Sequence, residues 1–157
     1  MVYNALAGTA VGLAYGMELE QIRAGIESLQ SLSGRFHIIE TERYTIIDDC
    51  YNANPMSMKA SLHVLKDALG RKVAILGDMG ELGAEELPLH EEERSAYMAE
   101  AARQENPELS VVYLPTLEEL LEKLPELVEE KDTILVKASH FMKFEQVVEK
   151  LQKYEEK

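Results

Sequence analysis

Hydrophobic residues at the start of the chain recur at the spacing of amphipathic helices. This spacing predicts one helix over residues 2–16, which Gly16 would end, and a second helix over residues 18–30. The apolar positions that set the spacing are Val2, Leu6, Ala10, Leu13 and Ala14 in the first helix, and Leu19, Ile22, Ile26 and Leu29 in the second. We therefore expect a helical pair at residues 1–32, ahead of a larger domain at residues 33–157.

Beyond this pair the pattern becomes that of strands and helices in alternation. Two β-branched or aromatic runs, at residues 36–40 and 44–48, predict a hairpin. Further helices are expected over residues 56–69, 87–104, 117–130 and 141–153, and further strands over residues 72–76, 110–114 and 132–137. Nearly unbroken apolar strands between helices are typical of a parallel sheet that is covered on both faces. The expected fold is α/β, with a Rossmann-like, doubly wound, mostly parallel sheet.

Composition narrows the class of protein. The 157 residues are enough for one or two domains, and a hydrophobic content of 46% is typical of a globular chain. With 16 basic and 29 acidic residues, the net charge is −13. That charge argues against binding to nucleic acid or to an anionic membrane surface, because both require clustered cations. No apolar run is long enough to insert into a membrane, and the single cysteine, Cys50, predicts a cytoplasmic location.

The polar residues that interrupt the apolar pattern follow the strands. In a doubly wound sheet the ligand site lies beyond the carboxyl ends of the strands, so these residues are the candidates for chemistry. They are Asp48 to Pro55, Gly77 to Gly83, Pro115 and Thr116, and Lys137 to His140. Asp49 is a candidate partner for ribose hydroxyls or a metal-bound water, and Lys137 and Ser139 are candidates to hold a carboxylate or phosphate. Asn52 and Asn54 are candidates to read an amide or a purine edge.

Each candidate also has a purely structural interpretation. Asp and Asn in a loop before a helix are common turn and capping residues, and Arg35 alone is an ordinary surface residue. Cys50 ends an apolar strand, which favours a buried, unreactive thiol over a nucleophile. Tyr51 fits a core position or a base-stacking position equally well. Because the sequence contains no G-x-x-x-x-G-K-[ST] loop, the residues alone indicate no more than a polar edge site for a small anionic ligand.

Several short segments nevertheless occur in a recognisable order. They are Asn4-Ala5-Leu6-Ala7, Gly34-Arg35, Asp48 to Pro55, Gly77 to Gly83 with His90, and Leu135 to Ser139. In this order they resemble the C-terminal domain of the Mur ligases. The Tyr-Asn-Ala-Asn run at residues 51–54 and the Gly-Asp-Met run at residues 77–79 resemble the MurF branch of that family. The resemblance extends over most of the chain.

The resemblance implies one domain of an ATP-dependent amide ligase of peptidoglycan synthesis, which adds D-alanyl-D-alanine to UDP-N-acetylmuramoyl-tripeptide. In that family ATP phosphorylates the tripeptide carboxylate, the dipeptide amine attacks the acyl phosphate, and Mg²⁺ neutralises phosphate charge. The P-loop and the metal ligands lie in a central domain that precedes the C-terminal domain in cis. Residues 1–32 would be the helical lead-in from that domain. The isolated chain is therefore expected to be inactive and to supply no metal ligand.

Matched motif by motif, the resemblance implies nucleotide contacts for several positions. Asn4 resembles the asparagine that lines the adenine side of the site, Arg35 the arginine that reaches the phosphates, and Asp49 the aspartate near the ribose and phosphates. Arg35 and Asp49 are thus the expected catalytic residues. Tyr51 and Asn52 stand where relatives meet the nucleotide or the incoming amine.

The same matching implies amine-substrate contacts nearer the end of the chain. Lys137 and Ser139 resemble the pair that holds the carboxylate of the incoming dipeptide, and Asn54 is expected to brace the neighbouring loop. After His90 the chain is expected to be one helix–strand unit shorter than its relatives. The mode of dipeptide recognition is therefore left open.

Other functions fit parts of this pattern. A related ligase such as folylpolyglutamate synthetase would share the fold, but the run at residues 51–55 argues against it. A stand-alone, non-catalytic binding domain, or an engineered domain derived from a Mur ligase, would also fit, and the shortening after His90 favours it slightly. Substrate-dependent phosphate release, measured once the preceding ligase domains are supplied, would separate the ligase from these alternatives.

Overall fold

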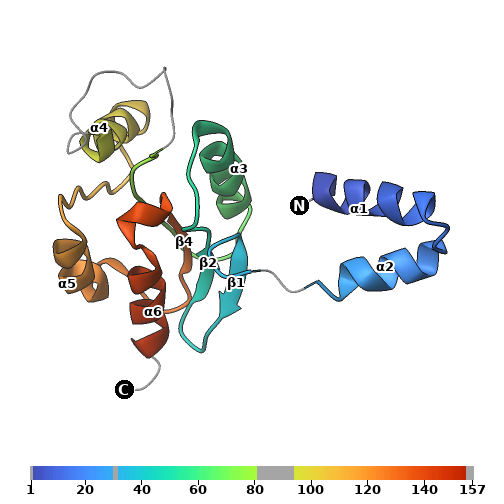
Figure 1. The fold of residues 1–157 in the computed structure, drawn as a ribbon. Coiled ribbons are helices and arrows are strands. Elements are labelled where there is room, and N and C mark those ends of the chain that lie inside the picture. The colour runs from blue at the N-terminus through green and yellow to red at the C-terminus, as the bar shows by residue number, and fades with distance from the viewer. Residues whose placement is uncertain (1, 30–31, 81–93, 155–157) are drawn as a thin grey trace. The chain divides into compact units, whose positions relative to one another are not determined.

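The computed structural model describes residues 2–29, 32–80 and 94–154 (Figure 1). It divides into two compact units, Met1–Ser31 and Leu32–Lys157. The described part of the first unit contains two helices, and the described strands all belong to the second. No helix in the described ranges is both long and apolar enough to cross a membrane.

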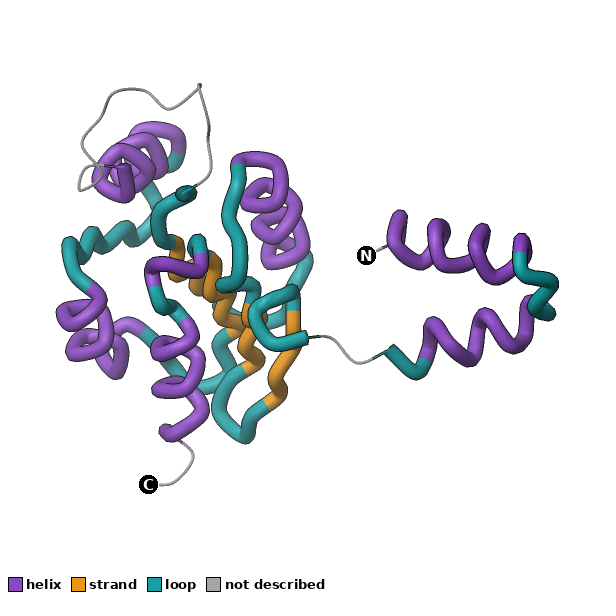
Figure 2. The backbone as a smooth tube through the Cα atoms, viewed as in Figure 1, coloured by secondary structure: helices purple, strands orange, loops and turns teal. Residues whose placement is uncertain are grey.

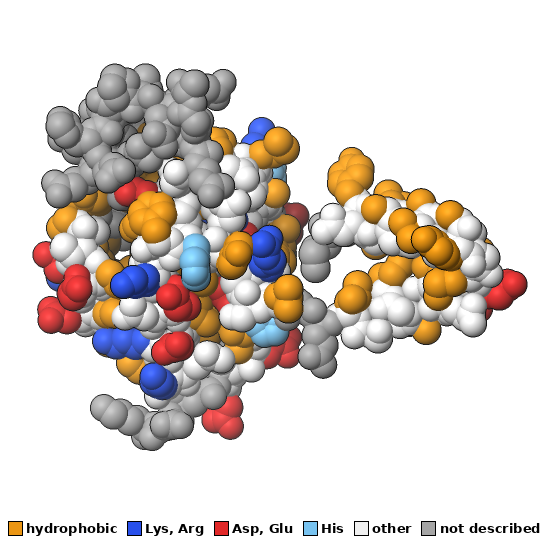
Figure 3. All heavy atoms as spheres, viewed as in Figure 1, with side chains coloured by type: hydrophobic (Ala, Val, Ile, Leu, Met, Phe, Trp, Pro, Cys, Tyr) orange, Lys and Arg blue, Asp and Glu red, His pale blue; other side chains and the backbone are white. Residues whose placement is uncertain are grey.

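The first unit consists of α1 (Val2–Ala14) and α2 (Leu19–Glu27), each slightly shorter than the apolar spacing predicts. Gly12 allows the two helices to approach closely, because a Cβ atom at this position would lie 2.8 Å from the side chain of Ile22. Ile22 is buried, whereas Figure 3 shows apolar side chains spread over the outside of the helical pair. A helical pair this small buries too little surface to fold stably as an isolated segment.

The second unit is built on a four-stranded sheet in the order β1-β2-β4-β3. Strands β1 (His37–Glu40) and β2 (Thr45–Asp48) form the antiparallel hairpin expected from the sequence. Strand β4 (Thr133–Lys137) pairs in parallel with β2 on one side and with β3 (Lys72–Leu76) on the other. Figure 2 shows these strands in orange, surrounded by helices. The prediction of a mostly parallel sheet in an α/β fold is confirmed.

Helices cover both faces of the sheet. Helices α5 (Leu117–Leu127) and α6 (Glu145–Lys153) form the main hydrophobic core with apolar residues of all three parallel strands. On the other face, α3 (Pro55–Lys66) packs through Leu65 onto neighbouring residues of β2 and β4. Every residue of β4 is buried, as expected for a central parallel strand with helices on both sides. This arrangement leaves the carboxyl ends of β2 and β4 next to each other.

The strand predicted over residues 110–114 is wrong. These residues have no regular secondary structure, although Leu114 packs against the main core. The carbonyl oxygen of Val111 accepts a hydrogen bond from Arg103 Nη2 at 3.1 Å, so a side chain occupies the place of a strand partner. Val112 is exposed. A short β-branched run fits an extended loop as well as a strand, because its preference depends on the neighbours that it finds.

The remaining differences lie at the ends of helices. The helix predicted over residues 141–153 divides into a 3₁₀ turn, His140–Met142, and α6. The reason is Lys143, whose φ of +56° is left-handed and cannot continue a right-handed helix. Of the helix predicted over residues 87–104, the structure describes α4 (Arg94–Glu105), and residues 81–93 lie outside the described ranges.

Candidate functional site

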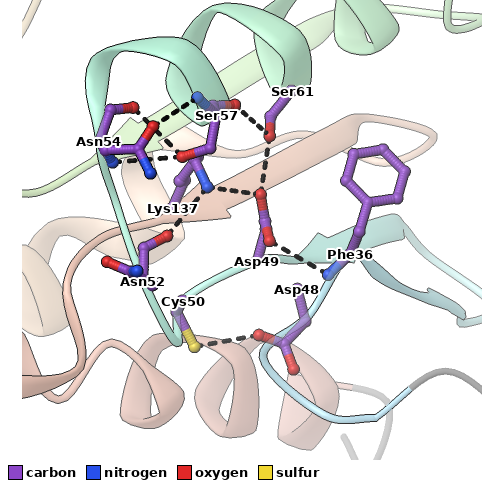
Figure 4. A network of polar contacts seen from close by, with 9 residues as sticks. All are labelled: Phe36, Asp48, Asp49, Cys50, Asn52, Asn54, Ser57, Ser61 and Lys137. Carbon is purple, nitrogen blue, oxygen red and sulfur yellow. Dashed lines mark hydrogen bonds and ion pairs between the residues drawn. The ribbon is translucent and has the colours of Figure 1, made fainter. Parts of the chain in front are cut away.

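The parallel pairing of β2 with β4 brings Asp49 and Lys137 together. Asp48 lies opposite Val136 in the ladder, and the N–H of Asp49 donates to the carbonyl of Val136 at 2.9 Å. Directly beyond this point Lys137 Nζ donates to Asp49 Oδ2 at 2.6 Å (Figure 4). The Lys137 side chain is 1% exposed and that of Asp49 is 16% exposed. The edge site that the sequence predicts is therefore organised around a buried ion pair.

Asp49 also ties this pair to the surrounding elements. Its Oδ2 accepts from the hydroxyl of Ser61 in α3 at 2.7 Å, and its Oδ1 accepts from the N–H of Phe36 at 3.2 Å. One carboxylate thus connects the loop before β1, the end of β2, helix α3 and strand β4. Asp49 was expected to approach ribose and phosphates; in this structure its oxygens are already engaged by protein donors.

The Lys137 ammonium faces inward rather than toward solvent. Besides Asp49, it donates to the carbonyl oxygen of Asn52 at 3.1 Å, which holds the loop between β2 and α3. The side chain of Asn52 is exposed, as the expected contact with nucleotide or amine requires. Contact between Lys137 and a dipeptide carboxylate, in contrast, would require this buried ammonium to become accessible.

Asn54 acts as the N-cap of α3. Its side-chain oxygen accepts from the N–H of Ser57 at 2.8 Å, and its own N–H donates to the Ser57 hydroxyl at 3.2 Å. This reciprocal pair is a capping box, and Pro55 occupies the first helical position, where no N–H is needed. Asn54 therefore has the capping role that its position before a helix allows, and the capping bond also braces the loop.

Arg35 and Tyr51 form the exposed part of the site. The Arg35 guanidinium carbon lies 4.1 Å from the centroid of the Tyr51 ring, which is within the range of a cation–π interaction. The same ring stacks on His140, with centroids 5.3 Å apart and planes at 28°. His140 is the last residue of the Lys137 to His140 run that the sequence places at the sheet edge, but the sequence assigns it no role there.

Ser139 connects the end of β4 to the glycine-rich loop. Its hydroxyl oxygen accepts from the N–H of Gly80 at 2.8 Å, and its N–H donates to the carbonyl of Asp78 at 3.1 Å. The side chain is buried. Ser139 thus shapes the loop floor, and its expected contact with a dipeptide carboxylate stays a prediction.

Cys50 is buried beneath this edge, as the sequence indicates. Its thiol donates to Asp48 Oδ1 at 3.0 Å. Burial, reinforced by this hydrogen bond and by the nearby carboxylates of Asp48 and Glu145, raises the pKa of the Cys50 thiol far above its ordinary value. The thiol stays protonated at neutral pH and cannot serve as a nucleophile.

Two further predicted features are not joined to this edge by the structure. Asn4 is exposed on α1 in the other unit, so its contact with adenine stays a prediction. His90 lies outside the described residues. Within the described ranges no group of three or more His, Cys, Asp or Glu side chains could hold a metal ion.

Comparison with known proteins shows which family this domain resembles. Residues 34–100 match the sequence profile described as "Mur ligase, glutamate ligase domain". Over these residues the chain carries a Mur ligase C-terminal domain. The UDP-N-acetylmuramoyl-tripeptide–D-alanyl-D-alanine ligase of Bacillus subtilis is 32% identical over 170 residues, covering 96% of this chain and 37% of that protein. The ligase of the same name from Escherichia coli is 41% identical over 90 residues, covering 57% of this chain and 20% of that protein.

Solved structures of MurF have the same fold as this Mur ligase domain. A crystal structure of MurF from Acinetobacter baumannii superimposes with a TM-score of 0.78 at 32% identity and covers 96% of this chain and 37% of its own. The MurF ligase of Thermotoga maritima, solved in complex with ADP, has a TM-score of 0.64 at 25% identity and covers 92% and 36%. The chain therefore spans little more than a third of the length of these relatives.

The alignment with the Bacillus subtilis ligase also bears on the length of the domain. It extends over 170 residues, which exceeds the 157 residues of the whole chain. The relative therefore contains positions that have no counterpart here. This agrees with the expectation that the present domain is shorter than its relatives.

Proposed function

We propose that this chain is the C-terminal domain of a cytoplasmic, ATP-dependent ligase that joins D-alanyl-D-alanine to UDP-N-acetylmuramoyl-tripeptide. The observation that carries the proposal is the edge constellation, in which Arg35 lies over Tyr51 beside the Lys137–Asp49 pair. This constellation occurs in a chain whose relatives along 96% of its length are named for that reaction. In this proposal residues 1–32 are the lead-in from the ligase's central domain.

Arg35 is the residue best suited to act on the nucleotide. It is exposed, permanently charged, and oriented by the Tyr51 ring. A cation fixed in this way stabilises the charge that develops on a phosphoryl group during transfer to the tripeptide carboxylate. Asn4 would contact the adenine, and Asp49 would act near the ribose and phosphates while it holds Lys137. The chain contributes closure and orientation to the reaction.

The incoming dipeptide would bind along the same edge. Tyr51 and the exposed Asn52 side chain lie where the amine enters, and Lys137 and Ser139 lie beneath them to receive its carboxylate. The Lys137 ammonium has three N–H donors, and two of them bind Asp49 and the Asn52 carbonyl. Because the side chain is 1% exposed, we propose that dipeptide binding is accompanied by a local change that makes this ammonium accessible.

Mg²⁺ and most of the ATP contacts would come from the preceding domains of the ligase. The sequence contains no P-loop. Among the described residues the carboxylate nearest the expected phosphates, Asp49, is occupied by a lysine, a serine and a backbone amide. Such a carboxylate is a poor fit for a metal. Bound Mg²⁺ would supply charge neutralisation at the phosphates, and the residues of this chain would orient the nucleotide around it.

The test is an assay of the chain joined to the part of the Bacillus subtilis ligase that precedes the aligned region. The expected result is phosphate release that requires both UDP-N-acetylmuramoyl-tripeptide and D-alanyl-D-alanine. Arg35→Ala in this fusion should lower kcat by at least about 10²-fold, which corresponds to roughly 2.7 kcal/mol of transition-state stabilisation. A fusion that folds and binds ATP but releases no phosphate would instead support a non-catalytic binding domain.

A further inference from the structure

Arg35 lies between two backbone amides that are held by different carboxylates. The N–H of Gly34 donates to Asp48 Oδ2 at 2.7 Å, and the N–H of Phe36 donates to Asp49 Oδ1 at 3.2 Å. Asp48 and Asp49 follow each other at the end of β2, so one rigid strand anchors both sides of the arginine. The direction in which Arg35 leaves the backbone is therefore set by these two bonds.

The backbone around Arg35 is also strained. Gly34 has a φ of +77°, which glycine adopts readily, but Phe36 has a φ of +54°, which is left-handed. A bulky residue in this region costs about 1–3 kcal/mol and persists only when the surrounding structure enforces it. The carbonyl of Gly34 adds a further restraint by accepting from the N–H of Tyr51 at 3.0 Å. The loop is thus held in one unusual conformation.

The consequence of this conformation is the position of the guanidinium. Arg35 is exposed, and a free arginine at a surface occupies many rotamers. Here it lies 4.1 Å from the centroid of the Tyr51 ring, which in turn stacks on His140. The backbone restraint and the ring together restrict the arginine before any ligand arrives.

Asp48 has no role in the proposed chemistry, yet it is 2% exposed and both of its carboxylate oxygens accept hydrogen bonds. Its Oδ2 accepts from the Ser33 hydroxyl at 3.1 Å as well as from Gly34, and its Oδ1 accepts from the Cys50 thiol. We propose that Asp48 is a positioning residue that fixes the loop of residues 33–36, so that Arg35 is oriented over Tyr51 toward a phosphate oxyanion. The phosphate part of this inference rests on the proposed function, whereas the positioning part does not.

The orientation of Arg35 can be measured on the chain itself by NMR. An arginine over an aromatic ring has side-chain protons that are displaced upfield by the ring current, and Tyr51→Ala gives the undisplaced reference. Asp48→Asn preserves size but turns one acceptor oxygen into an NH2 donor, so the side chain can no longer accept from both the Gly34 N–H and the Cys50 thiol. We expect Asp48→Asn to lose most of the displacement. A folded Asp48→Asn variant with the full displacement would overturn the proposal.

A matched control separates positioning from general stability. Asp132 is also a buried carboxylate, 1% exposed, but it lies at the opposite end of the sheet, where it binds Arg71. Asp132→Asn should lower the melting temperature and leave the Arg35 displacement unchanged. If Asp48→Asn does not fold, Ser33→Ala removes one of the same bonds at an exposed position. It should reduce the displacement, and no reduction would then overturn the proposal.

The fusion ligase provides the second measurement. Asp48→Asn should lower kcat about tenfold or more, because misplacing a catalytic group by about 1 Å can cost about 10²-fold. It should cause no further loss in an Arg35→Ala background, since a positioning residue acts only through the residue that it positions. Additive losses would contradict the proposal. An inactive fusion with a normal NMR result would count against the ligase function and leave the positioning role supported.

Discussion

Lys137 Nζ and Asp49 Oδ2 are 2.6 Å apart, and the two side chains of this pair are buried to different extents. Lys137 is 1% exposed, and its ammonium also donates to the carbonyl of Asn52, whereas Asp49 is 16% exposed and also accepts from Ser61 and Phe36. Removing either partner leaves the other charge unpaired. An unpaired Lys137 is more buried and has fewer remaining hydrogen bonds than an unpaired Asp49.

This asymmetry predicts unequal effects of the two single replacements. Asp49→Asn leaves a buried ammonium without a counter-charge and should destabilise the domain by about 3–5 kcal/mol. Lys137→Met leaves a carboxylate that retains two donors and access to solvent, so its cost should be smaller. Urea denaturation of both variants measures the difference. Equal costs, or a larger cost for Lys137→Met, would show that the pair is not organised as we describe.

The cap at Asn54 predicts a stability effect at the start of α3. Asn54→Ala removes the acceptor for the Ser57 N–H and should cost about 1 kcal/mol. Asn54→Asp keeps an acceptor and should remain close to the original stability. Asn52→Ala, at an exposed neighbour without a capping role, is the control. Thermal unfolding of the three variants checks the order, and an Asn54→Ala variant as stable as Asn52→Ala would contradict it.

The fold could be predicted from the sequence where burial on both faces left a clear pattern. Strand β4 is apolar along nearly its whole length because helices cover both sides. Strand β3 also coincides with the predicted residues 72–76, although Lys72 and Ala74 are exposed. The run at residues 110–114 has the same residue types but no strand partner. Pairing is a property of two segments, so one segment's composition cannot decide it.

The site could be predicted only as a set of positions. The rule that ligand sites follow parallel strands correctly brought Asp49 and Lys137 together, since both follow paired strands. It could not show that Lys137 faces inward, because the direction of a long side chain depends on the acceptors that it finds. The stacking of His140 on Tyr51 could not be predicted either, since it joins a loop and a 3₁₀ turn that are far apart in the sequence.

The raised pKa of the Cys50 thiol predicts how stability depends on pH. A thiol that ionises less readily in the folded chain has no effect below about pH 8.5, where it is protonated in both states. Above that pH the unfolded chain loses the proton and the folded chain keeps it, so stability falls by up to about 1.4 kcal/mol per pH unit.

Cys50→Ala should remove this contribution. We therefore expect the difference in unfolding free energy between the original chain and Cys50→Ala to be constant near neutral pH and to shift against the original chain in alkaline solution. Denaturation series at several pH values measure this difference. Rapid alkylation of the native thiol at neutral pH would show that Cys50 is neither buried nor protonated as described.

The close packing at Gly77 predicts a defect from a single methyl group. A Cβ atom at Gly77 would lie 2.8 Å from the Cβ of Ala138 and 2.9 Å from the ring of Phe144. The Cβ of Ala138 cannot move without its backbone, so Gly77→Ala should push the end of β3 away from β4 and cost about 1–3 kcal/mol. Gly25→Ala, within α2 and with nothing within 4 Å of the added Cβ atom, is the control and should stabilise its helix by up to about 1 kcal/mol.

Because the N–H of Gly77 donates to the carbonyl of Lys137, the Gly77→Ala defect should also disturb the Lys137–Asp49 pair. Amide hydrogen exchange of Lys137 and Ser139 measures this disturbance. Unchanged protection of these amides in a destabilised Gly77→Ala variant would show that the added methyl group displaces Phe144 and not the end of β4.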